Sequence, residues 1–363
     1  MRILHIISSA AAGGAEIYVR DLSIELVKAK HQVFILFLDR AKESGRDENF
    51  ERSFLEQLLN SGISYDFIGA DARKKPWKGI FFLRNIVNKF LPDIIHCHLY
   101  YAVFFSFFIK KSFNVVYTHH NIKIRVNKHI YKLMDFRVSR YIGICLACKT
   151  LLEDLTRRPV VRIDNGVSLN RIKRKETNEH TPYENNAKVR LVSVSGLYRQ
   201  KNLTLLISAL SKLADRRFLL NVAGEGAERE KLECLVRELG LEDNVVFLGN
   251  VNNVHDLLHD SDVFVMSSSW EGLPIAQIEA TLTGLPVIVT NVGGCSEIVH
   301  RVCNGIVVDE FDAENYCAAL SKIINDVNMR NMFSCNALRY SDDYLIEMSA
   351  KKHIDLYNNV MKT

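Results

Sequence analysis

The sequence predicts an α/β protein with two doubly wound parallel-sheet domains and a C-terminal helix that closes the chain. Short apolar runs alternate with longer helical patterns, the alternation stops once in a polar segment, and it then starts again. The length of 363 residues suits two domains, at roughly 150 residues per domain. With 48% hydrophobic and 25% charged residues, the composition excludes a disordered chain, a fibre and a disulfide-stapled miniprotein.

Residues 1–170 contain the first set of alternating elements, and we expect them to form the N-terminal domain. Apolar runs of strand length are Ile3–Ser8, Gln32–Leu38, Ser64–Ile68, Ile94–Cys97, Asn114–Thr118, Tyr141–Ile144 and Val160–Ile163. Helical patterns between them include Ala15–Lys28, Phe50–Leu59 and Ile80–Phe90. Strands that alternate with helices favour a parallel sheet built from βα units.

Residues 171–188 are polar, include Pro182 and predict the interdomain linker. The second domain, 189–340, restarts the alternation. Its expected strands are Arg190–Val194, Phe218–Val222, Val245–Leu248, Val263–Met266, Val287–Val289 and Gly305–Val308. Its expected helices are Asn202–Leu213, Ala227–Leu239, Pro274–Leu282 and Ala313–Val327. The tail, 341–363, predicts a helix that packs back on the N-terminal domain. Ligands bind beyond the carboxyl ends of parallel strands, so we expect the site in a cleft between two facing domains.

The eight cysteines are scattered, and only Cys145 and Cys148 form a C-x-x-C pair. Because no second ligand pair stands at zinc spacing, we expect reduced, mostly buried thiols. The N-terminus resembles a signal peptide, but its apolar run, Ile3–Ile7, is too short and contains a His. The most apolar stretch, Leu99–Ile109, is also too short to span a bilayer. We therefore expect a cytoplasmic protein, with a peripheral position on the inner face of the membrane as a further expectation.

Two loops that follow predicted strands have residues suited to phosphate. Gly13 and Gly14 lack Cβ atoms, so their backbone amides can approach a phosphate closely. Arg199 and Lys201 follow the first strand of the second half and could direct cationic groups at a diphosphate. An ordinary tight turn and a solvated basic loop are the respective alternatives.

Residues 223–229 supply two glycines of a dinucleotide-binding fingerprint, Gly224 and Gly226. Arg229 stands where the third glycine belongs, and the segment follows a middle strand rather than a first one. This pattern argues against a nicotinamide site.

The segment Ser267–Ala280 is the most informative. Pro274 suits the first turn of a helix, and the loop before it, with Gly272 and Leu273, would direct N–H groups at an anion. Glu271 precedes that helix and Glu279 follows eight residues later, so both carboxylates could accept hydrogen bonds from a polyol. Helix capping with an exposed Glu is the alternative.

Histidines end two predicted strands of the first half, His96 and His98 on one and His119 and His120 on the other. They could be zinc ligands, but no carboxylate accompanies them as a further ligand. We predict no metal site and expect His120 to line the cleft.

Together these segments resemble the retaining glycosyltransferases of family four, which have the GT-B fold. The resemblance covers nearly the whole chain, and its most specific part is Glu271-Gly-Leu-Pro-x4-Glu279, the E-x7-E motif of that family. Further matching segments are Gly13–Glu16, His96-x-His98, Thr118-x-His120, Asn165–Val167, Lys201–Asn202, Gly224-x-Gly226, Gly293–Gly294, Glu297–Val299 and Gly305.

The resemblance implies a role for each of these residues. Glu279 would bind the donor ribose, Glu271 the sugar hydroxyls, and His120 would lie beside the transferred sugar. The diphosphate would be held by Lys201, the Gly272 and Leu273 amides and the Gly13-Gly14 loop. Residues near Glu225 and Val251 would contact the base.

One position departs from the family pattern. The family has an Arg five residues before the Lys, where this chain has Gly196. Arg199 is a candidate to supply that charge from another angle.

The predicted reaction moves a sugar from a nucleotide-sugar, UDP- or GDP-linked, to a saccharide or polyprenyl-pyrophosphate-linked acceptor in bacterial surface polysaccharide synthesis. Charge develops on the leaving diphosphate, where Lys201 and helix-end amides would stabilise it. The resemblance implies retention of configuration. We predict catalysis without a metal or cofactor, by a front-face route in which the leaving phosphate accepts the proton of the acceptor.

The net charge of +5 is unevenly distributed. Residues 1–170 hold 26 Lys and Arg against 16 Asp and Glu, while residues 171–363 hold 21 against 26. Within 72–163 the count is 18 against 4, with basic runs at Arg73-Lys74-Lys75, Lys110-Lys111 and Arg157-Arg158. This distribution fits docking on an anionic membrane surface and a lipid-linked acceptor. A solvated basic face is the alternative, and no nucleic-acid-binding module accompanies the charge.

Three other functions compete with this one. They are a two-domain NAD-dependent dehydrogenase, a sugar-nucleotide epimerase of the same architecture, and a binding protein that keeps the fold and binds nucleotide without transfer.

Overall fold

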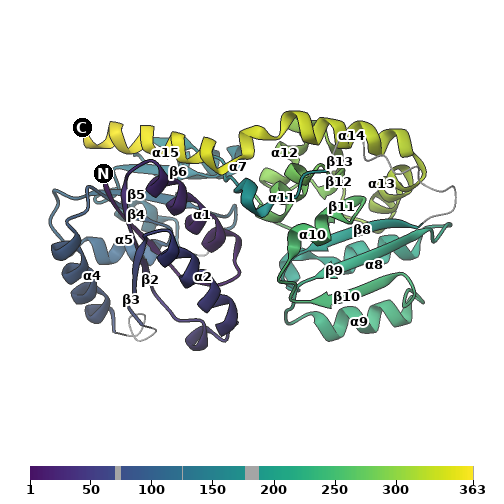
Figure 1. The fold of residues 1–363 in the computed structure, drawn as a ribbon, viewed down its shortest axis with the longest axis horizontal. Coiled ribbons are helices and arrows are strands. Elements are labelled where there is room, and N and C mark those ends of the chain that lie inside the picture. Colours follow the sequence, from purple (N-terminus) through teal and green to yellow (C-terminus); the bar gives the residue numbers. More distant parts are fainter. Residues whose placement is uncertain (70–74, 125, 176–187, 363) are drawn as a thin grey trace. The chain divides into compact units, whose positions relative to one another are not determined.

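The chain divides into two compact units, each built around a parallel sheet (Figure 1). The computed structural model describes residues 1–69, 75–124, 126–175 and 188–362. Unit 1 comprises Met1–Gly166 and Ile346–Thr363, and unit 2 comprises Val167–Leu345. Residues 176–187 of the predicted linker lie outside the described residues, as do the basic residues Arg73 and Lys74.

Unit 1 has a seven-stranded sheet in the order β3-β2-β1-β4-β5-β6-β7. Its strands are β1 (Arg2–Ile7), β2 (Gln32–Phe37), β3 (Ser64–Phe67), β4 (Ile94–Cys97), β5 (Asn114–His119), β6 (Arg140–Gly143) and β7 (Val160–Arg162). Every pairing in this sheet is parallel. The strand order reverses at β1, so the carboxyl ends of β1 and β4 flank a switch point of a doubly wound sheet.

Helices cover the sheet of unit 1 and bury its apolar residues. They are α1 (Gly14–Lys28), α2 (Glu48–Asn60), α4 (Pro76–Phe90), α5 (Tyr100–Ser106), α6 (His129–Met134), α7 (Leu146–Glu153) and α15 (Ile346–Met361). The last helix returns from the far end of the sequence and packs beside α1 (Figure 1). It starts at Ile346, later than expected, because Asp342–Tyr344 forms a 3-10 turn that belongs to unit 2.

Unit 2 has a six-stranded sheet in the order β10-β9-β8-β11-β12-β13. Its strands are β8 (Val189–Val194), β9 (Phe218–Ala223), β10 (Val245–Gly249), β11 (Val263–Met266), β12 (Val287–Thr290) and β13 (Gly305–Val308). Pairing is again parallel throughout. The predicted fold of two doubly wound sheets and a closing helix is confirmed.

Unit 2 has seven α-helices in its described residues. They are α8 (Leu203–Ser211), α9 (Arg229–Glu238), α10 (Val254–His259), α11 (Ile275–Thr283), α12 (Gly294–Val302), α13 (Ala313–Asn325) and α14 (Val327–Tyr340). The predicted helix 313–327 is wrong at its end, because Asp326 interrupts it and its side chain accepts a hydrogen bond from the Met329 N–H at 2.9 Å, which starts α14. Pro274 precedes α11 as its N-cap instead of lying in its first turn.

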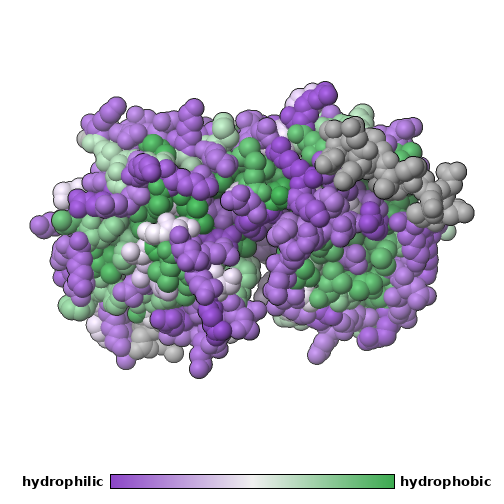
Figure 2. Space-filling view, in the orientation of Figure 1, coloured by the Kyte–Doolittle hydropathy of each residue, from purple (hydrophilic) through white to green (hydrophobic). Residues whose placement is uncertain are grey.

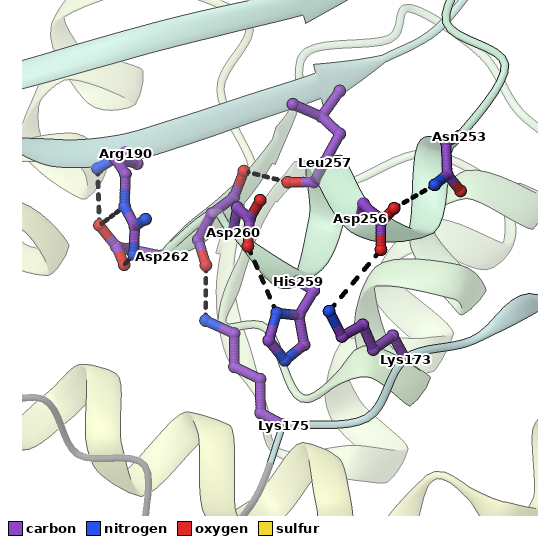
Figure 3. A network of polar contacts seen from close by, with 10 residues as sticks. Lys173, Lys175, Arg190, Asn253, Asp256, Leu257, His259, Asp260 and Asp262 are labelled. Carbon is purple, nitrogen blue, oxygen red and sulfur yellow. Dashed lines mark hydrogen bonds and ion pairs between the residues drawn. The ribbon is translucent and has the colours of Figure 1, made fainter.

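Residues 173–175, which the sequence assigns to the linker, are bound to unit 2 (Figure 3). Lys173 lies 3.8 Å from Asp256, and the Lys175 ammonium donates to the Ser261 carbonyl at 2.5 Å. Next to them Asp262, which is buried, accepts hydrogen bonds from the Arg190 backbone and guanidinium and thereby ties β8 to the start of β11.

The described cysteines are all free thiols, as expected, but the expectation that most are buried is wrong. Cys97, Cys145, Cys148 and Cys295 are buried, whereas Cys234, Cys303 and Cys335 are exposed. Cys145 precedes α7, and its sulfur accepts a hydrogen bond from the Cys148 N–H.

Candidate functional site

The loops at the carboxyl edge of the unit 2 sheet pack directly on one another. Leu197 N–H, in the loop after β8, donates to the Glu225 carbonyl in the loop after β9 at 2.9 Å. Gly224 has φ +137, and a Cβ there would lie 2.0 Å from the Ser195 carbonyl oxygen. A Cβ on Gly226 would lie 2.4 Å from the Leu197 oxygen. The two glycines of the incomplete fingerprint therefore allow these loops to meet.

Lys201 and Glu271 lie in contact at this edge. The Lys201 ammonium donates to Glu271 Oε1 at 2.6 Å, and the Ser268 hydroxyl donates to the same oxygen at 2.8 Å. Glu271 is buried, and its carboxylate lies next to a cation and a hydroxyl donor. Among the described residues both hydrogen bonds go to Oε1, which leaves Oε2 available to a ligand.

The loop after β8 is fixed to the loop after β11 by further hydrogen bonds. Ser269 N–H donates to the Gln200 carbonyl at 2.8 Å, and the Gln200 side chain donates to the Trp270 carbonyl at 2.9 Å. The Ser267 hydroxyl reaches the carbonyls of Lys201 and Asn202. These contacts set the position of Lys201 relative to Glu271 before any ligand binds.

The Glu271–Gly272–Leu273 backbone also contacts the loop after β12. Gly294 N–H donates to the Gly272 carbonyl at 2.6 Å, and Gly272 and Leu273 are buried. Gly293 has φ +50, and a Cβ there would lie 2.0 Å from the Glu271 carbonyl oxygen. The pair Gly293-Gly294 thus explains how the buried E-x7-E loop is supported.

Glu279, on α11, contacts a residue that the sequence did not single out. Its carboxylate accepts a hydrogen bond from Arg171, at the end of the 3-10 turn Leu169–Arg171. Glu279 is buried and Arg171 is partly exposed. The sequence placed Arg171 in a polar linker, where nothing marked it as the partner of a buried carboxylate.

The remaining predicted donor residues lie at the same edge but make fewer contacts with each other. Gly196 is half-buried and lies against the Tyr198 ring, and Arg199 is exposed. Glu225 forms an ion pair with Arg229 at 2.7 Å. Val251 is half-buried in the loop after β10. The structure therefore places Arg199 on the surface and pairs Arg229, at the third fingerprint position, with Glu225.

In unit 1, Gly13 and Gly14 lie at the start of α1, as predicted. Gly13 is its N-cap and Gly14 is exposed. Glu16 in the first turn is buried, accepts a hydrogen bond from the Ser8 hydroxyl and lies 3.7 Å from the Arg46 guanidinium. Nothing in the sequence marked a partner for Glu16. Its carboxylate occupies the space that a Cβ on Gly13 would need.

His120 follows β5 and belongs to a group of closely packed histidines. His5, His96, His98 and His353 complete the group, and all four are buried. Burial lowers the pKa of His5 and His120 to about 3 and that of His353 to about 4. Burial, followed by the neighbouring imidazoles, also holds the pKa of His96 and His98 well below its usual range. These rings are neutral at neutral pH.

Three of these rings, His5, His96 and His98, lie close enough to be a candidate metal site. Both nitrogens of His96 already have partners, the Tyr357 and Thr118 hydroxyls, each at 2.7 Å. Both nitrogens of His98 are bound by other histidines. An ion would have to replace these hydrogen bonds, so the contacts favour a hydrogen-bonded cluster.

Two family models match consecutive parts of the chain. The model for Glycosyltransferase Family 4 matches residues 12–171, and the model for Glycosyl transferases group 1 matches residues 174–340. Together they span most of the sequence, and each corresponds to one of the two sheets.

Curated relatives at full and partial length are also glycosyltransferases. The O-antigen biosynthesis glycosyltransferase WbnH of Escherichia coli is 25% identical over 364 residues, 96% of each chain. UDP-Gal:alpha-D-GlcNAc-diphosphoundecaprenol alpha-1,3-galactosyltransferase of the same species is 30% identical over 148 residues, 39% of this chain and 38% of that protein. The uncharacterized glycosyltransferase MJ1607 of Methanocaldococcus jannaschii is 32% identical over 176 residues, which are 47% of this chain and 45% of that relative.

Among solved structures, Alr3699/HepE of Anabaena in complex with UDP-glucose has a TM-score of 0.81 and 18% sequence identity, with 99% of this chain and 100% of that chain covered. At this identity the likeness concerns the fold. None of these matches supports the dehydrogenase or the epimerase. The chain belongs to the GT-B glycosyltransferases, with a Family 4 domain followed by a group 1 domain.

Proposed function

We propose that this glycosyltransferase moves a sugar, with retention of configuration, from a nucleotide-sugar to a lipid-linked saccharide in the synthesis of a bacterial surface polysaccharide. The observation that carries the proposal is the Lys201–Glu271–Ser268 contact at the carboxyl edge of the unit 2 sheet. Names of relatives add support, since one is assigned to O-antigen biosynthesis and another to a diphosphoundecaprenol-linked acceptor. A structural neighbour binds UDP-glucose, which favours a UDP-linked donor over a GDP-linked one.

The donor would be bound mainly by unit 2. An ammonium group has three N–H donors, so Lys201 can keep its bond to Glu271 and still donate to a diphosphate oxygen. Glu271 Oε2 would accept a hydrogen bond from a sugar hydroxyl. Glu279 would bind the ribose, in exchange for or alongside Arg171, and the segments at Glu225 and Val251 would contact the base.

Catalysis would depend on charge stabilisation at the leaving group. As the bond between the sugar and the phosphate breaks, negative charge grows on the diphosphate, where Lys201 and the amides at Gly272 and Leu273 would stabilise it. Gly13 and Gly14 would add backbone amides from α1. The leaving phosphate would take the proton of the acceptor hydroxyl on the same face of the sugar. His120 would contact the transferred sugar, and the proposal assigns no step to a metal.

Variants of Lys201 and Glu271 test this assignment. A thermal-shift screen with UDP, GDP, ADP and their sugars would identify the donor, and UDP and UDP-sugars are expected to stabilise the protein. With that donor, Glu271→Gln and Lys201→Ala should each lower kcat by about a hundredfold, the usual effect of removing an electrostatic contact to a developing charge. Normal transfer rates in both variants would refute the site. Nucleotide binding without transfer by the wild-type protein, with any acceptor, would favour the binding-protein alternative instead.

The acceptor side of the proposal depends on an exposed face of α4. Trp77, Phe81 and Arg84 are spaced four and three residues apart, so they share one face of the helix. Trp77 is 63% exposed and Phe81 66% exposed, and the neighbouring Lys78 is exposed as well. Figure 2 shows hydrophobic residues among hydrophilic ones on the surface around α4.

The turn after α5 extends this face. The Arg84 guanidinium donates to the Phe108 carbonyl at 2.7 Å, and Phe108 is exposed, with Lys110 and Lys111 close in sequence. Aromatic side chains next to cations are typical of a surface that inserts shallowly into an anionic bilayer. No helix in the described ranges is both long and apolar enough to cross a membrane.

Liposome flotation tests the membrane surface. We expect the protein to float with vesicles that contain anionic lipid and to remain behind with neutral ones. The double variant Trp77→Ser with Phe81→Ser should reduce flotation severalfold, while the matched variant Leu133→Ser with Phe136→Ser, at another exposed apolar site of unit 1, should not. Equal flotation with both lipids would remove the membrane from the proposal.

A further inference from the structure

Three histidines of unit 1 form a continuous hydrogen-bonded chain that the proposed function leaves unexplained. His98 Nδ1 lies 2.9 Å from His120 Nε2, and His98 Nε2 lies 3.0 Å from His5 Nδ1. His5 comes from β1, His98 follows β4 and His120 follows β5. The chain therefore runs from the centre of the sheet to its carboxyl edge.

Each end of this chain has a nitrogen without a partner among the described residues. At the inner end it is His5 Nε2, and at the outer end it is His120 Nδ1. His5 is fully buried, whereas His120 is half-buried. Both nitrogens are buried, but the inner one belongs to a central strand, whereas the outer one belongs to a residue that follows β5 at the carboxyl edge of the sheet and is partly exposed.

A neutral imidazole has one N–H donor and one acceptor nitrogen, so the three rings must share one direction of donation. Either direction leaves one buried N–H without a partner among the described residues, at His5 Nε2 or at His120 Nδ1, and only the one at the carboxyl edge of the sheet lies where a ligand of such a fold could accept its hydrogen bond. The favoured direction therefore has His5 Nδ1–H donating to His98, and His98 Nδ1–H donating to His120. His120 then accepts at Nε2 and carries its own hydrogen on Nδ1.

We propose that His98 is a positioning residue that holds His120 in the Nδ1–H form, ready to donate a hydrogen bond to an oxygen of the bound sugar. None of the described residues accepts that hydrogen bond, as expected of a donor that meets a ligand. The inference rests on the proposed function, because it acts through the contact of His120 with the transferred sugar. A histidine whose second nitrogen is held by a neighbour has both its tautomer and its ring orientation fixed.

The tautomer can be measured without any substrate. Protein labelled with ¹⁵N-histidine gives long-range ¹H–¹⁵N correlations that show which ring nitrogen carries hydrogen. His120→Gln and His98→Asn identify the signals by their absence. In the wild-type protein at pH 7.5 we expect His5, His98 and His120 all to carry hydrogen on Nδ1. An Nε2–H form of His120 would overturn the proposal.

Two variants of His98 separate the hydrogen bond from the volume of the ring. Asn places its amide N–H near the position of Nδ1 and should keep the donor to His120, whereas Leu removes it. With the nucleotide-sugar that the thermal-shift screen identifies, His98→Leu should lower kcat of transfer by about tenfold, with KM for the donor changed less than twofold. His98→Asn should stay within threefold of the wild-type kcat.

His353→Leu is the matched control, since His353 is also buried but does not belong to the chain of three hydrogen-bonded histidines. Its Nδ1 is hydrogen-bonded to the Ser349 carbonyl instead. This variant should keep kcat and the His120 tautomer. If His98→Leu does not fold, the wild-type spectrum and the His98→Asn variant still decide. If His98→Leu keeps the wild-type kcat while His120→Ala has a lower kcat, the positioning role of His98 is refuted, but the contact of His120 with the sugar is not. Wild-type kcat in His120→Ala would refute the proposed contact of His120 itself.

Discussion

Gly293 is the residue whose backbone conformation most directly supports the candidate site. Its φ of +50 is rarely adopted by other residues, and a Cβ would lie 2.0 Å from the Glu271 carbonyl oxygen, a backbone atom that cannot turn away. Gly293→Ala should therefore lower the free energy of unfolding by roughly 2–4 kcal/mol and weaken nucleotide binding. Urea unfolding and a UDP titration measure the two effects.

Gly240 provides the control for this substitution. It has a similar φ of +59 in the same unit, but a Cβ there would have as its nearest neighbour an Arg216 side-chain nitrogen 4.0 Å away. Gly240→Ala should show the backbone strain without the collision, about 1 kcal/mol, and leave UDP affinity unchanged. Equal losses in the two variants would mean that the contact with Glu271 has no particular effect.

At the same scale, the sequence indicated which residues belong to the site better than it indicated their contacts. Glu271 and Lys201 were predicted, and the structure brings them to 2.6 Å. Ser268 and Arg171 were missed, because a serine before a helix and an arginine in a polar run fit many environments. Arg171 is 108 residues from Glu279 in the sequence, and a single sequence does not contain that pairing, whereas Ser268 is only 3 residues from Glu271 and lies in the segment that the sequence did indicate.

At the scale of elements, the break between α13 and α14 depends on two side chains. Asp326 caps the start of α14, and the buried Arg330 donates to the carbonyls of Ile323 and Ile324 at the end of α13, at 2.6 and 2.7 Å. Asp326→Ala should lower the free energy of unfolding by about 1 kcal/mol, the typical value of an N-cap. Asp326→Ser keeps an acceptor and should lose less in the same urea titration. Equal losses would argue against capping.

This break also shows why strands were easier to predict than helix ends. A central parallel strand is buried on both faces and reads as an apolar run, so β4 and β11 have the bounds that the sequence predicts. The apolar pattern of α13 continues into α14, and only the capping contacts of Asp326 and Arg330 separate them. Short helices such as α10 were missed because six residues carry too little periodicity.

For the whole molecule, the buried imidazoles of unit 1 make stability depend on pH. His5 and His353 are fully buried, and burial lowers their pKa to about 3 and about 4, from 6.5. The unfolded chain binds these protons more readily than the folded one, so stability is fully present above pH 6.5 and falls as the pH drops toward 4. Between pH 7.5 and 5.5 each ring should cost about 1.4 kcal/mol.

Urea unfolding at pH 7.5, 6.5 and 5.5 measures this loss. The wild-type protein should lose about 3 kcal/mol over the range from these two rings, and more from His96, His98, His119 and His120, whose pKa is also lowered by burial. His353→Leu removes one titrating ring and should lose about 1.4 kcal/mol less over the same range, even if it is less stable at pH 7.5. If the wild-type protein and His353→Leu lost stability equally, His353 would not be held neutral by burial in the folded protein.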